Sequence, residues 1–347
     1  MSANFKLDFS TLADNHPKVA EQIDRLLGPN GLGYCVITNI PKYDALRSKL
    51  LEMGHQLLIK PKDELAYLRS KSEDFYVGYS DNPFVTDDGI MHTMHTSFVA
   101  RPLQETSIAP DKPELEQGLS NIWPKNDEFS TVFQEFGRII AMCQLELFKS
   151  INKWLEKKVY GFLESACNNI IKDYDVVSRL INYHPVEDFT KDSDDITWDG
   201  WHTDYGLITA LTHPTYWDAA GTRIICPKTC LWIKDRQGKS HEILISESDL
   251  VLIPSNSFLF LSGGLIPPTA HLIKISQGMP RNLYRTTIAT FFQPQPSYCM
   301  SIPGGRTFDE IKKSTFHMSD FFEDGISFGA YSDRLLDYLI SRKGTVK

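Results

Sequence analysis

Apolar positions divide the chain into a helical first half and a strand-rich second half. From Phe129 to Trp154 the apolar residues recur every three or four positions, which predicts one long helix that ends near residue 157. The same period from Tyr43 to Leu57 predicts a helix that Pro61 breaks or restarts. Shorter helices are expected over about 159–172 and 331–342. Short apolar runs bounded by turn residues predict strands over 32–40 and, after residue 176, over 178–184, 205–212, 222–226, 230–234, 241–245, 250–254, 258–262, 271–275 and 284–293.

Many short strands at this spacing are typical of a sandwich or jelly roll and not of a parallel α/β sheet. We therefore predict a mainly β fold with helices, in which a double-stranded β-helix (jelly roll) core is supported by an N-terminal α/β region and the long helix. The expected parts of this one integrated unit are the N-terminal α/β region 1–115, the supporting helices 116–175, the jelly-roll core 176–300 and a C-terminal extension 301–347 with its closing helix.

Composition and charge exclude several classes of function. The formal net charge of the 347-residue chain is −8, so there is no global electrostatic case for binding nucleic acid or an anionic membrane. The N-terminus lacks the pattern of a signal peptide, and no apolar run approaches the roughly 18 residues of a transmembrane helix. A cytoplasmic protein is expected, with protein partners unknown. Cys226 and Cys230 have a zinc-like spacing, but no second pair follows, and reduced thiols are expected.

A histidine and a carboxylate stand two residues apart at the start of an apolar run, in His202-Thr203-Asp204. On a strand, positions i and i+2 point to the same face, so the two side chains could converge on one metal ion. The pair alone is a weak signal. A second histidine, His271, lies near the end of the same strand-rich region, and Arg285 opens the strand beyond it. Two histidines and one carboxylate form the facial triad of non-haem Fe(II) oxygenases.

These motifs together resemble the Fe(II)- and 2-oxoglutarate-dependent oxygenases of the isopenicillin N synthase-like family. The ordered set is far more specific than any single piece, and it covers roughly residues 30 to 295. The matching segments follow the family's order and are Gly33–Asn39, Asn121–Pro124, Leu180–Pro185, His202–Leu211, His271 and Arg285–Ala289.

The resemblance implies that Fe(II) is bound by His202, Asp204 and His271. It also implies that 2-oxoglutarate and O2 are co-substrates, that ascorbate can serve as reductant, and that a small molecule is oxidised, typically by hydroxylation, with release of succinate and CO2. The ligand carboxylate leaves the iron complex at net +1, which favours an anionic chelator. The residues that hold 2-oxoglutarate are then Arg285, Thr287, Asn182 and His184, with Arg285 supplying a bidentate fork.

The chain departs from the family's pattern around this co-substrate pocket. His184 stands where many members carry a tyrosine, and an imidazole is shorter and titrates. Arg281 is a rival to Arg285, because the interval from His271 to Arg285 is a few residues longer than usual. Arg285 is preferred since a strand-like run follows it directly. Substrate contacts from Phe291, Tyr79 and His95 follow from family position, whereas the segments 72–102 and 186–200 and the C-terminal tail have no family pattern.

Three alternatives remain open at this stage. An Fe(II) oxidase of the same fold that does not use 2-oxoglutarate would turn the arginine and hydroxyl pair toward a substrate carboxylate. A non-catalytic scaffold has no reason to keep all three ligands in register, and a zinc hydrolase lacks an additional acid or base beside the motif. His92 and His95 would form a second metal site only on a helix, and Gly89 favours a loop there.

Overall fold

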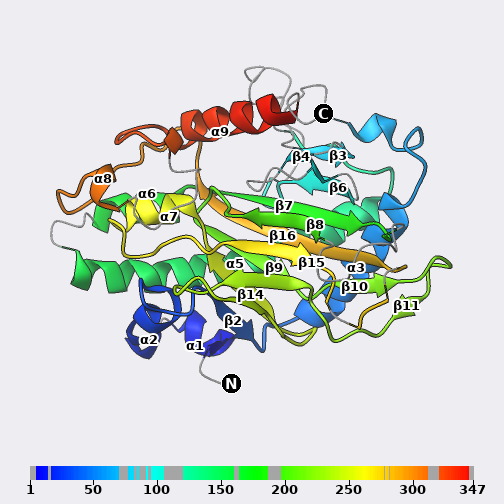
Figure 1. Cartoon of the computed structure of the whole chain (residues 1–347), viewed down its shortest axis with the longest axis horizontal. Coiled ribbons are helices and arrows are strands. Elements are labelled where there is room, and N and C mark those ends of the chain that lie inside the picture. Colours follow the sequence, from blue (N-terminus) through cyan, green and yellow to red (C-terminus); the bar gives the residue numbers. More distant parts are fainter. Residues whose placement is uncertain are drawn as a thin grey trace.

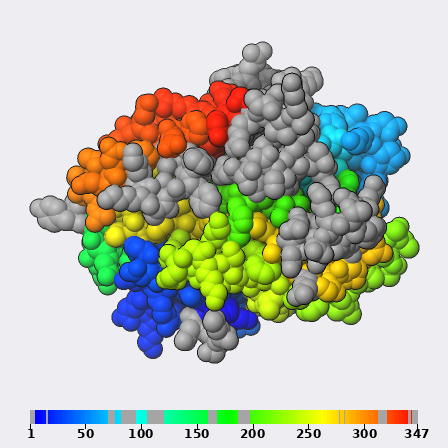
Figure 2. All heavy atoms as spheres, viewed as in Figure 1, coloured from blue at the N-terminus to red at the C-terminus, as the bar shows by residue number. Residues whose placement is uncertain are grey.

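The protein is described by a computed structural model that covers residues 5–14, 17–69, 77–81, 84–85, 91–92, 95–104, 120–159, 164–186, 197–276, 278–280, 282–311 and 320–343. Within these ranges no helix is both long enough and apolar enough to span a membrane. Figure 2 shows the first part of the chain (blue) and its last part (red) on opposite sides of the middle part (green to yellow).

Two β-sheets, whose strands are mostly antiparallel, form the centre of the molecule (Figure 1). The order in the larger sheet is β1 (Lys6–Asp8), β2 (Cys35–Thr38), β14 (Leu250–Pro254), β9 (Ile208–Thr212), β16 (Tyr284–Pro294), β7 (Tyr174–Tyr183), β6 (His95–Ala100) and β3 (Gly78–Ser80), while β10 (Thr215–Trp217) pairs with β16 and β11 (Arg223–Ile224). The order in the smaller sheet is β13 (Ser240–Glu242), β12 (Leu231–Lys234), β15 (His271–Lys274) and β8 (Thr197–His202). A separate ladder joins β4 (Phe84–Val85) and β5 (Met91–His92).

Helices cover the larger sheet. The longest, α5 (Asp127–Lys158), starts at Asn126, whose side chain accepts the Glu128 N–H, and two acidic residues in its first turn and two lysines in its last complement the helix dipole. Figure 1 shows α2 (Pro17–Leu27) at one edge of the molecule and α9 (Phe328–Lys343) at the opposite edge. The other helices among the described residues are α1 (Phe9–Ala13), α3 (Tyr43–Leu58), the 3₁₀ helix η1 (Ala66–Leu68), α6 (Glu164–Lys172), α7 (Asn256–Leu261) and α8 (Phe308–Ile311).

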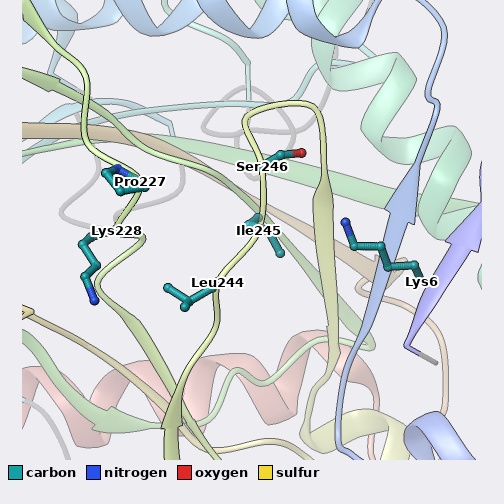
Figure 3. Close-up of a pocket in the computed structure, with 6 residues that line it drawn as sticks. All are labelled: Lys6, Pro227, Lys228, Leu244, Ile245 and Ser246. Atoms are coloured by element: carbon teal, nitrogen blue, oxygen red, sulfur yellow. The ribbon is translucent and has the colours of Figure 1, made fainter. Parts of the chain in front are cut away.

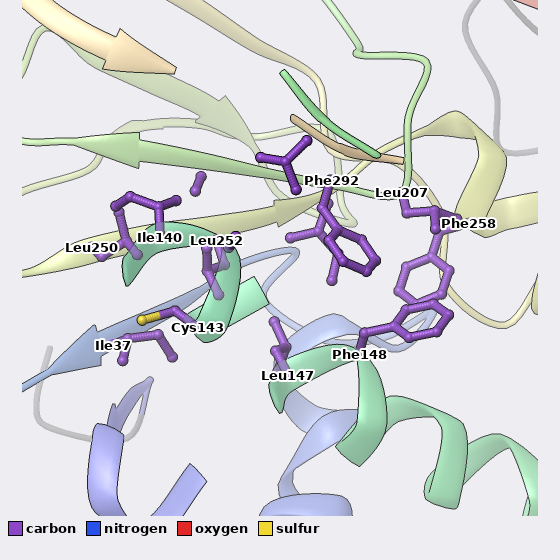
Figure 4. Packing of buried hydrophobic residues seen from close by; sticks show 14 of the residues in the cluster. Ile37, Ile140, Cys143, Leu147, Phe148, Leu207, Leu250, Leu252, Phe258 and Phe292 are labelled. Atoms are coloured by element: carbon purple, nitrogen blue, oxygen red, sulfur yellow. The ribbon is translucent and has the colours of Figure 1, made fainter. Parts of the chain in front are cut away.

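Alternation along β7 and β16 divides the buried side chains into two clusters. The even-numbered residues Leu180, Ile288 and Phe292 pack toward the helices, where Figure 4 shows Phe292 near Phe148 and Phe258. The odd-numbered residues Ile181, Tyr183 and Ala289 join a second cluster together with residues of the smaller sheet such as Trp198 and Ile233. Successive residues of a strand point to opposite faces, so the second cluster lies between the two sheets and forms the jelly-roll interior.

The predicted fold class is confirmed, as are the long helix, which is α5, and the closing helix, which is α9. A turn at Asp235–Gly238 closes the hairpin between β12 and β13, with the Gly238 N–H bonded to the Asp235 carbonyl. The strand expected over 258–262 is wrong, because this stretch belongs to helix α7, whose residues are all buried. A short apolar run has no periodicity to separate a buried strand from a buried helix.

Candidate metal centre

The three predicted metal ligands meet at one point of the jelly roll. His202 ends β8 and His271 begins β15, and the antiparallel register makes these two residues direct partners. The rings of His202 and His271 are 4.2 Å apart between centroids. Asp204 places one carboxylate oxygen 4.0 Å from His202 Nε2 and the other 3.7 Å from His271 Nε2. One ligand atom from each side chain lies within 4.8 Å of the others, and no other such group exists among the described residues.

Backbone hydrogen bonds orient both imidazoles for metal binding. His202 Nδ1 lies 2.7 Å from the Gly200 carbonyl, and His271 Nδ1 lies 3.2 Å from the Thr269 carbonyl. A carbonyl only accepts, so each Nδ1 carries the proton and each Nε2 keeps its lone pair. Both Nε2 atoms face the Asp204 carboxylate. Two nitrogen donors and one oxygen donor in this arrangement fit Fe(II), with coordination positions left for other ligands.

The local backbone differs from the one predicted for this motif. His202 and Asp204 do not share a strand, because β8 ends at His202 and β9 begins only at Ile208. Asp204 instead lies in the connection by which the chain passes from the smaller to the larger sheet. Gly206 makes this crossing tight, since a Cβ on it would lie 3.1 Å from the Phe292 carbonyl oxygen. The two side chains converge as predicted, but not because they follow one another on a single strand.

Helix α7 holds this connection from its N-terminal end. The Asn256 N–H donates to the Asp204 carbonyl at 2.8 Å, and the Ser257 N–H donates to the Gly206 carbonyl at 3.0 Å. The Asn256 side chain adds bonds of 2.8 Å to the Thr203 hydroxyl and to the Asp204 carbonyl. The first N–H groups of a helix have no partners within it, so here they fix the backbone that carries the metal-binding carboxylate.

The electrostatics of the centre favour a bound cation. Burial lowers the pKa of His271, and the neighbouring His202 lowers it further. Thr209 donates to Asp204 Oδ2 at 2.5 Å and orients that carboxylate. The His271 side chain is 5% exposed, whereas those of His202 and Asp204 keep 19% and 14%, so the ligand set is open on one side.

Arg285 is buried in the same interior, near the start of β16. Its Nε and Nη2 both donate to the Thr229 carbonyl, at 3.2 and 2.9 Å, and its guanidinium lies 5.1 Å from the centre of the Tyr183 ring. Its Nη1 is buried and has no hydrogen-bond partner in the described part of the chain. Thr287 follows on the same face, with its hydroxyl 3.2 Å from that of Thr212. A buried cationic donor without an acceptor fits a carboxylate ligand.

The structure does not place the side chains of Asn182 and His184 beside Arg285 and Thr287. Asn182 pairs with Thr286, not Arg285, and accepts the Thr286 hydroxyl at 2.8 Å on the helix-facing side of the sheet. His184 lies 3.3 Å from the Thr96 hydroxyl and near the Tyr284 ring. The physical reason is the period of two: Tyr183, between them, takes the inward position. The same alternation indicates that Tyr183 faces inward beside Arg285, and the sequence analysis did not single out this residue.

The candidate substrate residues divide between the two faces. Phe291 pairs with Thr209, which bonds Asp204, and His95 pairs with Tyr183 and lies 2.9 Å from Arg179 Nη2. Both therefore belong to the inner face. Tyr79 pairs with Phe98 and packs in the helix-facing cluster, away from the triad.

The remaining sequence candidates do not add a second centre. Arg281 and the side chain of His92 lie outside the described residues. Cys230 is buried with its Sγ 3.3 Å from both the Tyr216 hydroxyl and Met279 Sδ, and it joins no metal-binding group among the described residues. A pocket of about 380 Å³ contains none of the triad (Figure 3). Its lining consists of Lys6, Pro227, Lys228, Leu244, Ile245 and Ser246.

Comparisons with known proteins identify the fold of the chain. No protein-family model and no curated protein sequence matches the chain. Among solved structures, a full-length Neurospora crassa protein in complex with alpha-KG superposes with a TM-score of 0.66 at 18% identity, covering 96% of this chain and 95% of that one. A 2OG-Fe(II) oxygenase family protein from Caulobacter crescentus gives 0.70 at 16% identity, covering 97% and 99%. JOX2 in complex with 2OG, Fe and JA gives 0.64 at 13% identity, covering 96% and 84%. The chain therefore has the fold of the 2-oxoglutarate- and Fe(II)-dependent oxygenases.

Proposed function

We propose that the protein is an Fe(II)- and 2-oxoglutarate-dependent dioxygenase that oxidises a small molecule. The observation that carries this proposal is the joint occurrence, in the interior between the two sheets, of the His202–Asp204–His271 group and of an Arg285 Nη1 that has no hydrogen-bond partner among the described residues. The first is a ligand set for Fe(II), and the second is a fixed cation for the far carboxylate of a dicarboxylate.

Different residues would bind the metal and the co-substrate. His202, Asp204 and His271 would hold Fe(II), which when bound supplies the oxidative decarboxylation of 2-oxoglutarate to succinate and CO2. Asp204 contributes the only negative charge of the ligand set, so the loaded site keeps a positive charge that attracts an anionic chelator. Arg285 and Thr287 would then fix the other end of 2-oxoglutarate, while the buried aromatic ring of Tyr183 limits access of water to that end.

Support for a small-molecule substrate comes from the neighbours of similar fold. The Neurospora crassa protein has been crystallised with thymine and JOX2 with JA, both together with the co-substrate. In this chain Phe291 and His95 are the predicted contacts that lie on the inner face. Hydroxylation is the expected outcome, and the substrate itself is to be found by screening.

Substrate-stimulated turnover of 2-oxoglutarate tests the proposal directly. The anaerobically Fe(II)-loaded protein is expected to bind 2-oxoglutarate and, with a member of a metabolite library, to release succinate and CO2 in equal amounts. The variant His202→Ala should do neither. Fe(II) uptake without any binding of 2-oxoglutarate would favour an oxidase that does not use this co-substrate. Absence of Fe(II) uptake would favour a non-catalytic scaffold.

A further inference from the structure

A three-residue segment, Lys228–Thr229–Cys230, supplies the carbonyl that holds Arg285. It lies between β11 and β12. Lys228 lines the pocket of Figure 3 on one side of the segment, and the next residue, Thr229, accepts both hydrogen bonds from Arg285 on the other. Because Nε and Nη2 are both engaged by one oxygen, the plane of the guanidinium is set and Nη1 is the nitrogen left for a ligand.

The backbone of Cys230 is in the left-handed region, with φ +58°. Few residues other than glycine adopt this conformation, because it brings the Cβ too close to the following carbonyl oxygen. Among the described residues it is shared by only two other non-glycine positions, Asn39 and Lys42. The reversal at Cys230 lets the chain direct the Thr229 carbonyl toward Arg285 and then continue directly into β12.

Bonds on the far side of the segment keep it in this shape. The Cys230 N–H donates to Glu242 Oε1 at 3.2 Å, and the Ser276 hydroxyl donates to the same oxygen at 2.5 Å. The Lys228 ammonium lies 3.4 Å from the other carboxylate oxygen of Glu242. The Tyr216 hydroxyl donates to the Lys228 carbonyl at 2.9 Å, and Tyr216 is also a strand partner of Arg285. Glu242 is thus linked to Arg285 through the backbone of residues 229 and 230.

We propose that Cys230 and Glu242 are positioning residues for co-substrate binding, which act by aiming the Thr229 carbonyl at Arg285. This inference rests on the proposed function. The energy at stake is that of a charge-assisted hydrogen bond. Its loss would allow the guanidinium to rotate and would weaken binding of 2-oxoglutarate about tenfold or more. The iron ligands lie outside this chain of contacts, so Fe(II) binding should be unaffected.

Substitutions at Cys230 separate backbone shape from side-chain contacts. Cys230→Val strongly disfavours the left-handed backbone, because its side chain is β-branched, whereas Cys230→Gly favours it. The valine variant is expected to raise the Kd and KM for 2-oxoglutarate about tenfold with a smaller change in kcat, and the glycine variant should stay within about twofold of the parent. Cys226→Val is the matched control, since Cys226 does not have a positive φ. Equal affinity in the valine and parent proteins, or equal loss in the glycine and valine variants, would overturn the proposal.

A second pair of variants covers the case in which Cys230→Val does not fold. Glu242→Ala removes the acceptor of the Cys230 N–H, and Glu242→Gln keeps an amide oxygen that can accept it. Weaker 2-oxoglutarate binding in the alanine variant and recovery in the glutamine variant are expected, with Fe(II) affinity equal in both. Parental 2-oxoglutarate affinity in Glu242→Ala contradicts the inference. Parent protein that binds Fe(II) but no 2-oxoglutarate contradicts the proposed function instead.

Discussion

The two faces of strands β7 and β16 show how one stretch of sequence carries both packing and chemistry. Tyr183 and Arg285 are paired and face the interior between the sheets, where the guanidinium lies over the ring. Asn182 and Thr286, each one position away, are paired as well and face the helices, where the Thr286 hydroxyl bonds both Asn182 and Trp217. Each pair leaves one buried donor without a partner among the described residues, Arg285 Nη1 on the inner face and Asn182 Nδ2 on the outer face, but only the inner donor is cationic.

The difference teaches that nearness to the site along the sequence is a poor guide to function here. A shift of one residue moves a side chain to the other face of a sheet. Asn182 adjoins the inward-facing Tyr183, yet it belongs with His55, whose Nδ1 is 3.2 Å from its oxygen. Function is therefore expected to follow the parity of the position along each strand.

The largest effect should follow from a change at the metal centre itself. Asp204→Ala removes the only charged ligand and is expected to lower Fe(II) affinity more than about a hundredfold, beyond the effect typical of residues that only orient a ligand. Calorimetric titration with Fe(II) under anaerobic conditions measures this. His241→Ala, at a partly exposed position paired with Asp235, is the control and should bind iron as the parent does. Near-parental iron binding by Asp204→Ala would reject the assigned ligand set.

The second largest effect is expected from a direct comparison of substitutions on the two faces of β7 and β16. Arg285→Gln should weaken 2-oxoglutarate binding about ten- to a hundredfold, the cost of a hydrogen bond to a charged group. Asn182→Ala on the opposite face should leave that affinity within about twofold while lowering the free energy of unfolding by about 1–3 kcal/mol, because buried polar partners lose their bonds. Titration with 2-oxoglutarate and urea denaturation give the two quantities. A large loss of affinity in Asn182→Ala would return this residue to the co-substrate pocket and break the distinction between the faces.

Sequence reasoning predicted the elements that have a strong period and the ligands that belong to an ordered set. The long helix α5 and the β7 and β16 strands follow from repeated apolar positions, and the three metal ligands meet as expected. The cause of their meeting was not predictable from the local motif. It depends on the pairing of His202 with His271 between strands far apart in the sequence, and register of that kind is set by tertiary contacts.

The segment that sequence reasoning assigned wrongly is also the one that fixes the metal loop. Most of α7 falls in a stretch that was expected to be a strand, and as a helix it donates the N–H groups of its first turn to carbonyls of the connection that carries Asp204. Nothing in a short apolar run signals that role, because Asn256 and its acceptor at Asp204 are 52 positions apart in the sequence. The co-substrate anchor shows the same limit: Arg285 was predicted, but the carbonyl that holds it, at Thr229, has no side-chain signature.

A smaller effect is expected from Thr209, which lies on the inner face and bonds the metal ligand Asp204. Thr209→Val keeps the shape of the side chain but removes the hydroxyl that donates to Asp204 Oδ2, and it should lower Fe(II) affinity about tenfold. Thr209→Ser restores the donor and should recover most of that loss. The same titration that tests Asp204→Ala measures both variants. Equal iron affinity in the valine and serine variants would mean that this hydrogen bond does not orient the carboxylate.

The smallest effect belongs to the outer face and appears as a dependence of stability on pH. Burial lowers the pKa values of His55 and His184 below the ordinary 6.5. Below pH 6.5 the unfolded chain therefore binds protons that the folded protein excludes, so the free energy of unfolding should fall as the pH is lowered from about 7.5 through the depressed folded values. Urea denaturation of metal-free protein at several pH values measures this slope. His184→Gln keeps a polar side chain that does not titrate, and it should flatten the slope by the contribution of one histidine, at most about 1.4 kcal/mol per pH unit. An unchanged slope would show that His184 is protonated as readily in the folded protein as in the unfolded chain, and would place it on a wetter surface than its contacts with Thr96 and Tyr284 indicate.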